Sequence, residues 1–205
     1  MTGLDYDAIY RDTADSGGPP WDIGGPQPAL AAVIEEGLPG PAVLDVGCGS
    51  GDLAIALARR GYEVTAVDSS EVAIAQARAK AARAGLVIRF EAQDATALTL
   101  SGAPFDVVID SGLLHSLDRG GGGTAERYLA LLPDLVAPDG MLLVLAVSPA
   151  AGQGWGLTEE YLRAAFPPPV WVDTHVRDII VAAEPDGERL ALAGHLVRTV
   201  RAPLV

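Results

Sequence analysis

The stretch VLDVGCGSGDL, from Val43 to Leu53, carries the strongest structural signal in the chain. Its first residues predict a buried strand, Gly47, Gly49 and Gly51 predict a tight turn, and an apolar helix is expected to begin at Leu53. Glycine lets the backbone turn sharply and lets a ligand approach the main chain closely. Free N–H groups at the start of a helix favour a negatively charged ligand group. A strand, a glycine turn and a helix in this order predict a nucleotide-binding site.

The spacing of the glycines distinguishes two classes of nucleotide ligand. A dinucleotide fingerprint, G-x-G-x-x-G, would need its third glycine at the position of Asp52. The third glycine stands at Gly51 instead, and an acid, Asp45, lies two residues before the first glycine. This pattern resembles the first motif of class I S-adenosylmethionine-dependent methyltransferases. The resemblance implies that the cofactor contacts Asp45, Gly47, Cys48, Gly49 and Gly51.

The length of 205 residues fits one domain with a full hydrophobic core. We expect a single methyltransferase domain over residues 1–205, with an N-terminal lid or helical segment at 1–38 and a Rossmann-like core at 39–205. An apolar content of 49% with few aromatic residues suits an α/β protein. The single cysteine excludes an internal disulfide, and we interpret Cys48 as a small turn residue rather than a reactive thiol.

The charge balance limits the kinds of partner. The chain has 14 Lys plus Arg against 27 Asp plus Glu, and its net charge is −13. Because nucleic-acid binding depends on cations that neutralise phosphates, we expect a small-molecule partner and no nucleic acid. The longest apolar run, Met141 to Val147, is too short to span a membrane, and the acidic start MTGLDYDAIY does not resemble a signal peptide. The expected location is the cytoplasm, and the oligomeric state stays open.

A second predicted strand, Glu63 to Asp68, ends in an acid about twenty residues beyond the glycine turn. At this position an α/β nucleotide site places a carboxylate that accepts hydrogen bonds from a ribose. The resemblance implies that Asp68 binds the ribose hydroxyls of S-adenosylmethionine and that Ser69 lies beside the adenine. The alternative is a structural role at the start of the alanine-rich helix that follows, which is expected to reach about Ala84.

A third predicted strand, Leu86 to Ala92, leads into Asp94 and Ala95. The resemblance implies that Asp94 accepts a hydrogen bond from the adenine amino group and that the Ala95 N–H faces the ring. An aspartate that only stabilises a turn is the alternative. The methyltransferase pattern therefore places one ligand-binding position after each of the first three strands.

The fourth predicted strand, Phe105 to Asp110, is followed by Ser111, and we expect Asp110 and Ser111 to approach the cofactor. In open α/β sheets the ligand lies beyond the carboxyl ends of the strands, so this end should face the methyl group and its acceptor. Enzymes that methylate base amines usually carry Asn/Asp-Pro-Pro-Tyr/Phe here, which this chain lacks. His115 lies five residues beyond the strand and could act as a general base, or could line the pocket without transferring a proton.

The N-terminal segment narrows the resemblance. A short helix is expected from Leu4 to Arg11, and another from Pro28 to Glu36. Between them, a Pro-Trp-Asp-x-Gly-x-Pro-x-Pro pattern, with one added glycine, is similar to the thiopurine S-methyltransferase and thiol/halide methyltransferase superfamily and to small bacterial heterocycle methyltransferases. The resemblance implies that Trp21 lies near the cofactor, and a tryptophan that fills the core is the alternative. The matching residues are Pro20, Trp21, Asp22, Gly24, Pro26 and Pro28.

The last third of the chain predicts a fifth strand at Met141 to Val147, a loop that contains Trp155, and a helix from Leu157 to Phe166. Two β-rich stretches, 170–183 and 189–201, follow with a turn between them. We therefore expect a Rossmann-like α/β fold: a seven-stranded, mostly parallel sheet with an antiparallel C-terminal hairpin and helices on both faces. The methyltransferase resemblance implies the strand order 3-2-1-4-5-7-6. His175 and His195 are expected on the surface of the sheet.

These patterns together predict an S-adenosylmethionine-dependent methyltransferase. Its acceptor would be a sulfur, nitrogen or oxygen atom of a small molecule, such as a secondary metabolite or a xenobiotic. A nicotinamide-dependent reductase is disfavoured by Asp52 and by the lack of a Tyr-x-x-x-Lys pair. A protein that binds S-adenosylmethionine as a sensor, or for a reaction other than methyl transfer, stays open. The sequence shows no histidine–acid cluster with metal-ligand spacing.

Overall fold

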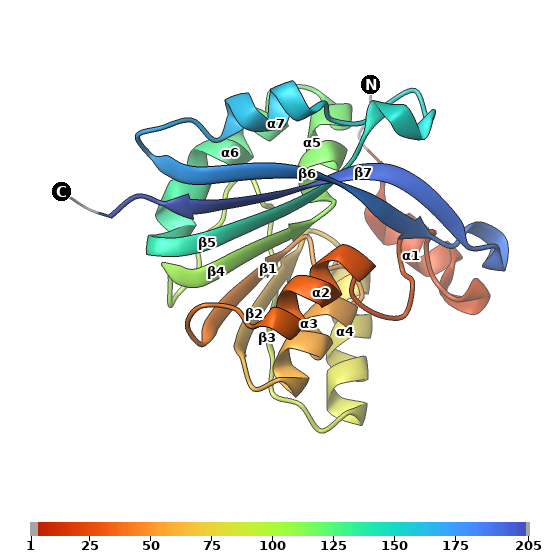
Figure 1. The fold of residues 1–205 in the computed structure, drawn as a ribbon. Helices are drawn as coiled ribbons and strands as arrows, with labels where there is room; N and C mark the ends of the chain where they lie inside the picture. Colours follow the sequence, from red (N-terminus) through yellow and green to blue (C-terminus); the bar gives the residue numbers. More distant parts are fainter. Residues whose placement is uncertain (1–3, 204–205) are drawn as a thin grey trace.

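A single seven-stranded sheet forms the centre of the molecule (Figure 1). The structure is a computed structural model that describes residues 4–203, without the side chains of residues 16 and 186. The strand order is β3-β2-β1-β4-β5-β7-β6, and only the pairings of β7 are antiparallel, which confirms the predicted fold class and topology. The strands are β1 (Ala42–Val46), β2 (Glu63–Asp68), β3 (Arg89–Ala92), β4 (Phe105–Ser111), β5 (Val136–Val147), β6 (Trp171–Ala183) and β7 (Leu190–Arg201).

Six of the seven α-helices among the described residues cover the two faces of the sheet. Alternate strand residues point to opposite faces, so the apolar runs of the central strands fill two separate cores. Helices α2, α3 and α4 pack on one face, and α5, α6 and α7 pack on the other. The helices are α1 (Tyr6–Asp12), α2 (Pro28–Glu36), α3 (Asp52–Arg59), α4 (Glu71–Arg83), α5 (Leu113–Gly120), α6 (Thr124–Leu135) and α7 (Glu159–Ala165).

The register of the parallel strands aligns their carboxyl ends along one edge of the sheet. Val46, the last residue of β1, pairs with Val67 on one side and with Asp110 on the other. Asp68, the last residue of β2, pairs with Ala92 at the end of β3. The segments that follow β1, β2, β3 and β4 therefore meet at the same edge, where ligands of open α/β sheets bind.

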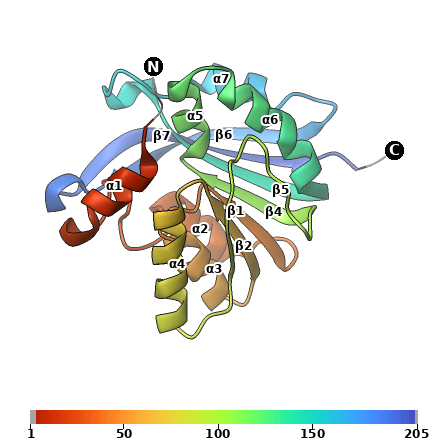
Figure 2. The same ribbon diagram turned by 180° about the vertical axis from the view of Figure 1, so that it is seen from behind.

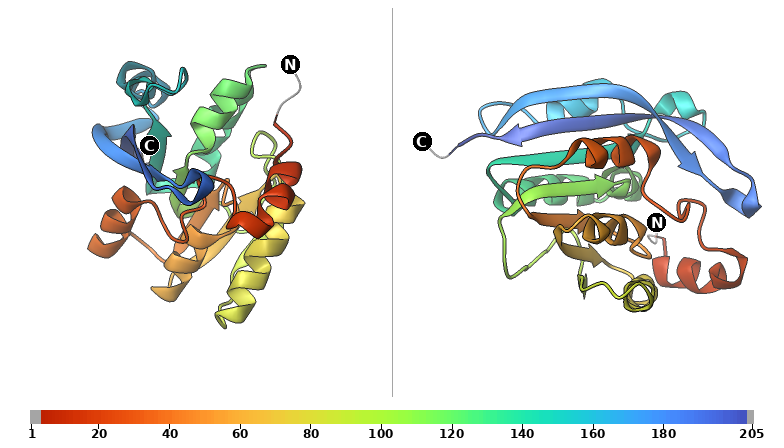
Figure 3. Two further views of the ribbon diagram at one scale, coloured as in Figure 1. Left: turned by 90° about the vertical axis from the view of Figure 1, so that its right-hand side faces the viewer. Right: turned by 60° about the horizontal axis from the view of Figure 1, so that its bottom comes forward.

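The β6–β7 hairpin extends past the end of β5 and holds the N-terminal segment. Strand β5 ends where Val147 pairs with Gly194, whereas β6 and β7 remain paired as far as Ala183 and Leu190. The Gln27 side-chain amide forms two hydrogen bonds with the backbone of Ala182, of 2.8 and 2.9 Å. Figures 1 and 3 show the hairpin beside the segment that carries α1. The hairpin and the N-terminal segment thus form one wall beside the carboxyl edge.

Several element boundaries differ from the sequence-based expectations. Strand β3 begins at Arg89 rather than Leu86, because it is the edge strand and has one neighbour to pair with. Strand β5 begins at Val136 rather than Met141, and the added residues include an irregularity in which Asp139 has a φ of 62°. The helix expected from Leu157 to Phe166 is the shorter α7. Helix α5 was not predicted.

His195 was expected on the surface of the sheet, and this expectation is wrong. His195 lies where β7 is paired with both β5 and β6, within its continuously buried stretch at residues 194–197, and it is only 8% exposed. Its Nδ1 atom lies 3.0 Å from the carboxylate of Asp178 on β6. His175, on the outer strand β6, is exposed as predicted.

None of the helices formed by residues 4–203 is long and apolar enough to cross a membrane. The N-terminal stretch MTGLDYDAIY, which does not resemble a signal peptide, lies partly outside the described residues, which begin at Leu4.

Candidate active site

The glycine loop between β1 and α3 is held against the neighbouring strand. The N–H groups of Gly47 and Cys48 both donate to the carbonyl of Val67, at 2.8 and 2.9 Å. Gly51 has a φ of +86° and precedes the first residue of α3, and a Cβ at this position would lie 2.8 Å from Cβ of Ala77 on α4. The glycine at position 51 is therefore required both by the backbone conformation and by close packing.

Asp68 connects the glycine loop to the start of α4. Its carboxylate accepts hydrogen bonds from the N–H groups of Gly49 (2.8 Å) and Ser70 (2.9 Å). Burial raises the pKa of Asp68, although these two N–H groups oppose that shift. A carboxylate can accept about four hydrogen bonds, so lone pairs remain for a ligand hydroxyl. Ser69 is exposed at the same strand end, and the cap of α4 is Ser70, whose hydroxyl accepts from the N–H of Ala73 (3.1 Å).

Asp94 combines a turn with a free acceptor. It is exposed just beyond β3, and its Oδ1 atom accepts hydrogen bonds from both the N–H and the hydroxyl of Thr96, each at 2.8 Å. Its Oδ2 atom forms no hydrogen bond within the described part of the chain. Asp94 therefore stabilises a turn, which was the alternative interpretation, and it still has one carboxylate oxygen available for a ligand. The neighbouring Ala95 is 8% exposed.

Asp45 lies beneath the glycine loop and is almost completely buried. Neither of its carboxylate oxygens has a hydrogen-bond partner among the described residues. Burial, together with the nearby carboxylates of Asp68 and Asp110, raises the pKa of Asp45 to about 8. A buried carboxylate without a partner is costly, so this group fits a site that receives a hydrogen-bond donor or a positive charge.

Asp110 has a structural role that the sequence did not reveal. It is fully buried, and its carboxylate accepts three N–H groups at the start of α5, from Gly112 (3.0 Å), Leu113 (2.7 Å) and Leu114 (3.0 Å). Burial raises the pKa of Asp110 to about 7 against these hydrogen bonds. The expected approach of Asp110 to the cofactor finds no support in this geometry, because its oxygens face into α5. Ser111, at the end of the same strand, is half-buried.

His115 lies at the carboxyl edge of the sheet, on the first turn of α5. Its Nδ1 atom accepts the N–H of Val147, at the end of β5, at 3.3 Å. Its ring lies 5.2 Å from the ring of Trp155, and the guanidinium carbon of Arg119 lies 5.1 Å from the centre of a Trp155 ring. Burial, with the positive charge of Arg119, lowers the pKa of His115 to about 4. These side chains form an aromatic wall with one cation beside it.

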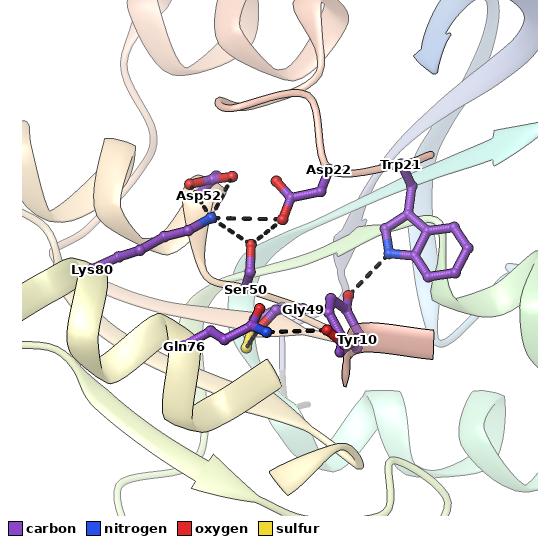
Figure 4. A network of polar contacts seen from close by, with 9 residues as sticks. Tyr10, Trp21, Asp22, Gly49, Ser50, Asp52, Gln76 and Lys80 are labelled. Carbon is purple, nitrogen blue, oxygen red and sulfur yellow. Dashed lines mark hydrogen bonds and ion pairs between the residues drawn. The ribbon is translucent and has the colours of Figure 1, made fainter. Parts of the chain in front are cut away.

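The N-terminal segment lies over the glycine loop. The hydroxyl of Tyr10 is so close to Gly49 that any side chain at that position would collide with it. The indole N–H of Trp21 donates to this hydroxyl at 2.9 Å, as Figure 4 shows. Trp21 is 45% exposed, so the interpretation that it fills the core is wrong. It covers Tyr10 from outside, next to the expected cofactor position.

A group of four side chains, which we call the clasp, fastens this segment to the loop (Figure 4). The clasp consists of Asp22, Ser50, Asp52 and Lys80. The Lys80 ammonium lies 2.6 Å from the Ser50 hydroxyl, 3.0 Å from Asp52 and 3.6 Å from Asp22, and Ser50 donates to Asp22. Burial and the adjacent Asp22 raise the pKa of Asp52 to about 6. Hydrogen bonds from Asp52 and Ser50, with the charge of Lys80, lower the pKa of Asp22 against the effect of burial.

Helix α1 is fixed to the start of α4 (Figure 2). The Asp7 carboxylate accepts hydrogen bonds from the hydroxyl of Ser70 (2.5 Å) and the N–H of Val72 (3.2 Å). The Gln76 side-chain amide donates to the carbonyl of Tyr10 at 3.2 Å. Neither the clasp nor these contacts could be predicted, because each of the contacts joins residues that lie 28 or more positions apart in the sequence. The sequence contains two signals for members of the clasp: the pattern around Trp21 includes Asp22, and Lys80 is the chain's single lysine.

Cys48 and the acids of the site do not form a nucleophile or a metal centre. Burial, with the carboxylates of Asp45 and Asp68, raises the pKa of the Cys48 thiol well above its usual value. This thiol therefore stays protonated and weakly nucleophilic, in agreement with a small turn residue. Among residues 4–203, no group of three His, Cys, Asp or Glu side chains is arranged to hold a metal ion.

Comparison with known proteins identifies the family. A family model described as a methyltransferase domain matches residues 43–140. A 2-heptyl-1-hydroxyquinolin-4(1H)-one methyltransferase of Mycobacteroides abscessus is 34% identical over 150 residues, which cover 71% of this chain and 65% of that protein. An uncharacterised methyltransferase of Mycobacterium tuberculosis is 34% identical over 182 residues, which cover 79% of this chain and 87% of that protein.

A solved structure from work on the conversion of a disulfide bond into a thioacetal group during echinomycin biosynthesis has a TM-score of 0.84. It is 33% identical, and the match covers 96% of this chain and 91% of that one. The chain spans a smaller share, 40% to 43%, of the ubiquinone biosynthesis O-methyltransferases that it also matches. The fold and the glycine loop agree with the matches that extend over most of the M. tuberculosis relative and of the solved structure. The chain belongs to the class I S-adenosylmethionine-dependent methyltransferases.

Proposed function

We propose that the protein transfers the methyl group of S-adenosylmethionine to a sulfur, nitrogen or oxygen atom of a small aromatic molecule. The observation that carries the proposal is the shared edge of the sheet. The glycine loop, Asp68 and Asp94 follow β1, β2 and β3 there, and the aromatic wall of His115 and Trp155 lies at the ends of β4 and β5. A cofactor side and an acceptor side thus lie next to one another.

The residues at this edge fit the cofactor. Asp68 has lone pairs free for ribose hydroxyls, and Asp94 has one free oxygen for the adenine amino group. Asp45 offers a buried carboxylate that lacks a donor beneath the loop, which suits a positively charged ligand. Gly47, Cys48 and Ala95 would supply backbone contacts, as the family resemblance implies. Ser69 would lie beside the adenine, and Ser111 beside the reacting end of the ligand.

S-adenosylmethionine supplies a methyl group on a sulfonium, whose departure as a neutral thioether needs no acid. The work of the chain is then to align the acceptor with the methyl group and to exclude water. The segment at residues 4–38 acts as a lid, because Tyr10 and Trp21 cover the loop and the clasp holds the segment there. The aromatic wall orients the acceptor ring from the opposite side.

The relatives support a small-molecule acceptor of the secondary-metabolite or xenobiotic kind. One of them is named as a methyltransferase of a hydroxyquinolone, and another comes from echinomycin biosynthesis. The narrower assignment to the thiopurine S-methyltransferase and thiol/halide methyltransferase superfamily rests on the segment around Trp21. We retain it as part of this proposal, with sulfur or a heterocyclic nitrogen or oxygen as the favoured acceptor atom.

The test is the formation of S-adenosylhomocysteine with a panel of thiols, phenols and N-hydroxylated heterocycles. Methyl transfer to one member, with a methylated product found by mass spectrometry, supports the proposal. Tight binding of S-adenosylmethionine without turnover on any member would favour the alternative of a sensor, or of a reaction other than methyl transfer.

A further inference from the structure

We propose that His115 is a hydrogen-bond donor rather than a base, and that it positions an aromatic acceptor which enters the site already ionised. The substrate class would be aromatic thiols, phenols and N-hydroxy heterocycles that lose their proton in solution. This inference rests on the proposed methyl transfer and specifies its acceptor. His115 is a positioning residue in this account.

The backbone of β5 determines which ring nitrogen of His115 carries the proton. The N–H of Val147 donates to Nδ1 at 3.3 Å, so Nδ1 must offer its lone pair. When Nδ1 of a neutral imidazole itself accepts a hydrogen bond, the proton resides on Nε2. The nitrogen left for a ligand is therefore a donor, whereas a general base would need a free lone pair there.

The Nε2 atom lies at the strand end where the acceptor is expected. The His115 ring covers Gly112, the first residue after β4: a Cβ on this glycine would lie 3.1 Å from Cε1 and 3.7 Å from Nε2. Nε2 forms no hydrogen bond within the described part of the chain, and the residue is half-buried. An unused donor at the carboxyl edge of the sheet is suited to an acceptor oxygen, sulfur or nitrogen that carries negative charge.

The surroundings keep the imidazole neutral. Val147, Trp155 and Gly112, which lie against its ring, have no charge, and the charged group that acts on it is Arg119 on the same helix. Burial and this cation oppose protonation of His115. A neutral ring that resists protonation is a weak base, so it would remove a proton from a thiol or hydroxyl poorly.

The neighbouring groups suit an aromatic anion. Trp155 presents a ring next to His115, inclined by 32°, and aromatic rings of this kind favour offset or edge contacts with a planar ligand. The Arg119 guanidinium lies against Trp155 and brings a positive charge to this wall, although the chain as a whole has a net charge of −13. Together, the ring, the cation and the Nε2–H donor recognise a planar molecule with negative charge on its acceptor atom.

The chemical step balances without a base. The acceptor loses its proton to water before it binds. Its lone pair then forms the bond to the methyl carbon while the carbon–sulfur bond of the sulfonium breaks, and that electron pair remains on sulfur. No proton moves in the step, so His115 needs only to hold the acceptor atom in line.

The tautomer can be measured without any turnover. In protein labelled with ¹⁵N-histidine, two-dimensional NMR distinguishes the two neutral tautomers, and the variants His175→Gln and His195→Gln assign the three imidazoles. We expect the Nε2–H tautomer for His115. We also expect no titration between about pH 6 and pH 8, the range that includes the usual histidine pKa of about 6.5. An Nδ1–H tautomer, or a midpoint near the usual value, would overturn the proposal.

Ligand selectivity tests the acceptor class in protein loaded with S-adenosylhomocysteine. We expect 4-nitrophenolate to bind at least about tenfold more tightly than the neutral 4-nitroaniline, on the scale of a hydrogen bond to a charged group. His115→Phe keeps an aromatic ring and the Arg119 cation but loses the donor, so it should markedly reduce this preference. His115→Gln keeps a donor and should retain most of it, and the exposed His175→Gln should not change it. Equal binding of the two probes, or a preference that is undiminished in His115→Phe, would contradict the inference.

These two readouts separate this inference from the proposed function. The expected tautomer and phenolate preference, without methyl transfer to any acceptor, would refute the proposed function and leave the donor role intact. Methyl transfer whose rate does not follow the ionised fraction of the acceptor, and which falls steeply in His115→Gln, would refute the donor role alone.

Discussion

Replacement of Gly51 by alanine should destabilise the fold through two separable effects. Gly51 has a φ of +86°, and the left-handed region costs a residue with a side chain about 1–2 kcal/mol. The new methyl would also lie 2.8 Å from Cβ of Ala77 and 3.2 Å from the ring of Phe90. Overpacking of this kind costs about 1–3 kcal/mol, so the expected loss of unfolding free energy is roughly 2–5 kcal/mol.

Gly61 provides a matched control for the backbone term. Its φ is +89°, but a Cβ at this position would meet no atom within 4 Å. Gly61→Ala should therefore lose about 1–2 kcal/mol, the cost of the backbone conformation alone. Denaturant unfolding measures both variants, with unchanged m-values as the check that the same transition is compared.

The difference between Gly51→Ala and Gly61→Ala isolates the packing of the glycine loop against α4. If the two variants lose the same free energy, α4 does not constrain the loop as the structure indicates, and the packing argument is refuted. Binding of S-adenosylmethionine gives a second comparison, since only the Gly51 variant disturbs the loop that would contact the cofactor.

Three further predictions concern charged side chains. Asp68→Ala should weaken S-adenosylmethionine binding at least about tenfold in calorimetric titration, whereas Glu63→Ala, at the other end of β2, should not. The pKa of Asp45 is about 8 in the folded state and 3.8 as its usual value, so the contribution of Asp45 to the free energy of unfolding falls as the pH rises between these two values. Asp45→Asn should remove this fall, and denaturant unfolding at about pH 5 and pH 8 compares the two proteins. Lys80→Met should cost about 1 kcal/mol of unfolding free energy, because Lys80 is partly exposed, and the exposed Arg83→Met should cost less. Equal losses of unfolding free energy in Lys80→Met and Arg83→Met would show that the clasp does not stabilise the fold.

The sequence predicted those parts of the fold that local patterns determine. Strand β2 and helix α2 have the predicted bounds, because an apolar run that ends in Asp68 and a proline at the first turn are local signals. The strand order followed from the family resemblance and the β-rich C-terminal third. The same reasoning brought the glycine loop, Asp68 and Asp94 to one edge, since parallel strands align their carboxyl ends there.

Long-range contacts could not be predicted in the same way. Helix α5 was missed because Asp110, whose carboxylate accepts the N–H groups at the start of this helix, lies inside a strand and was interpreted as a ligand contact. The contact between Trp21 and Tyr10, 11 residues apart, and the link from Asp22 to the distant Lys80 follow no local pattern. The tautomer of His115 depends on a backbone N–H of β5, 32 residues away, which no property of the α5 sequence indicates.

The most direct test of the central claim is calorimetric titration of the purified protein with S-adenosylmethionine and S-adenosylhomocysteine, with NADH as the control ligand. The account predicts binding of both adenosyl ligands with dissociation constants on the order of micromolar, near −8 kcal/mol, and no binding of NADH. Binding of NADH, or no binding of either adenosyl ligand to protein shown to be folded, would contradict the assignment of the glycine loop and Asp68 to the cofactor.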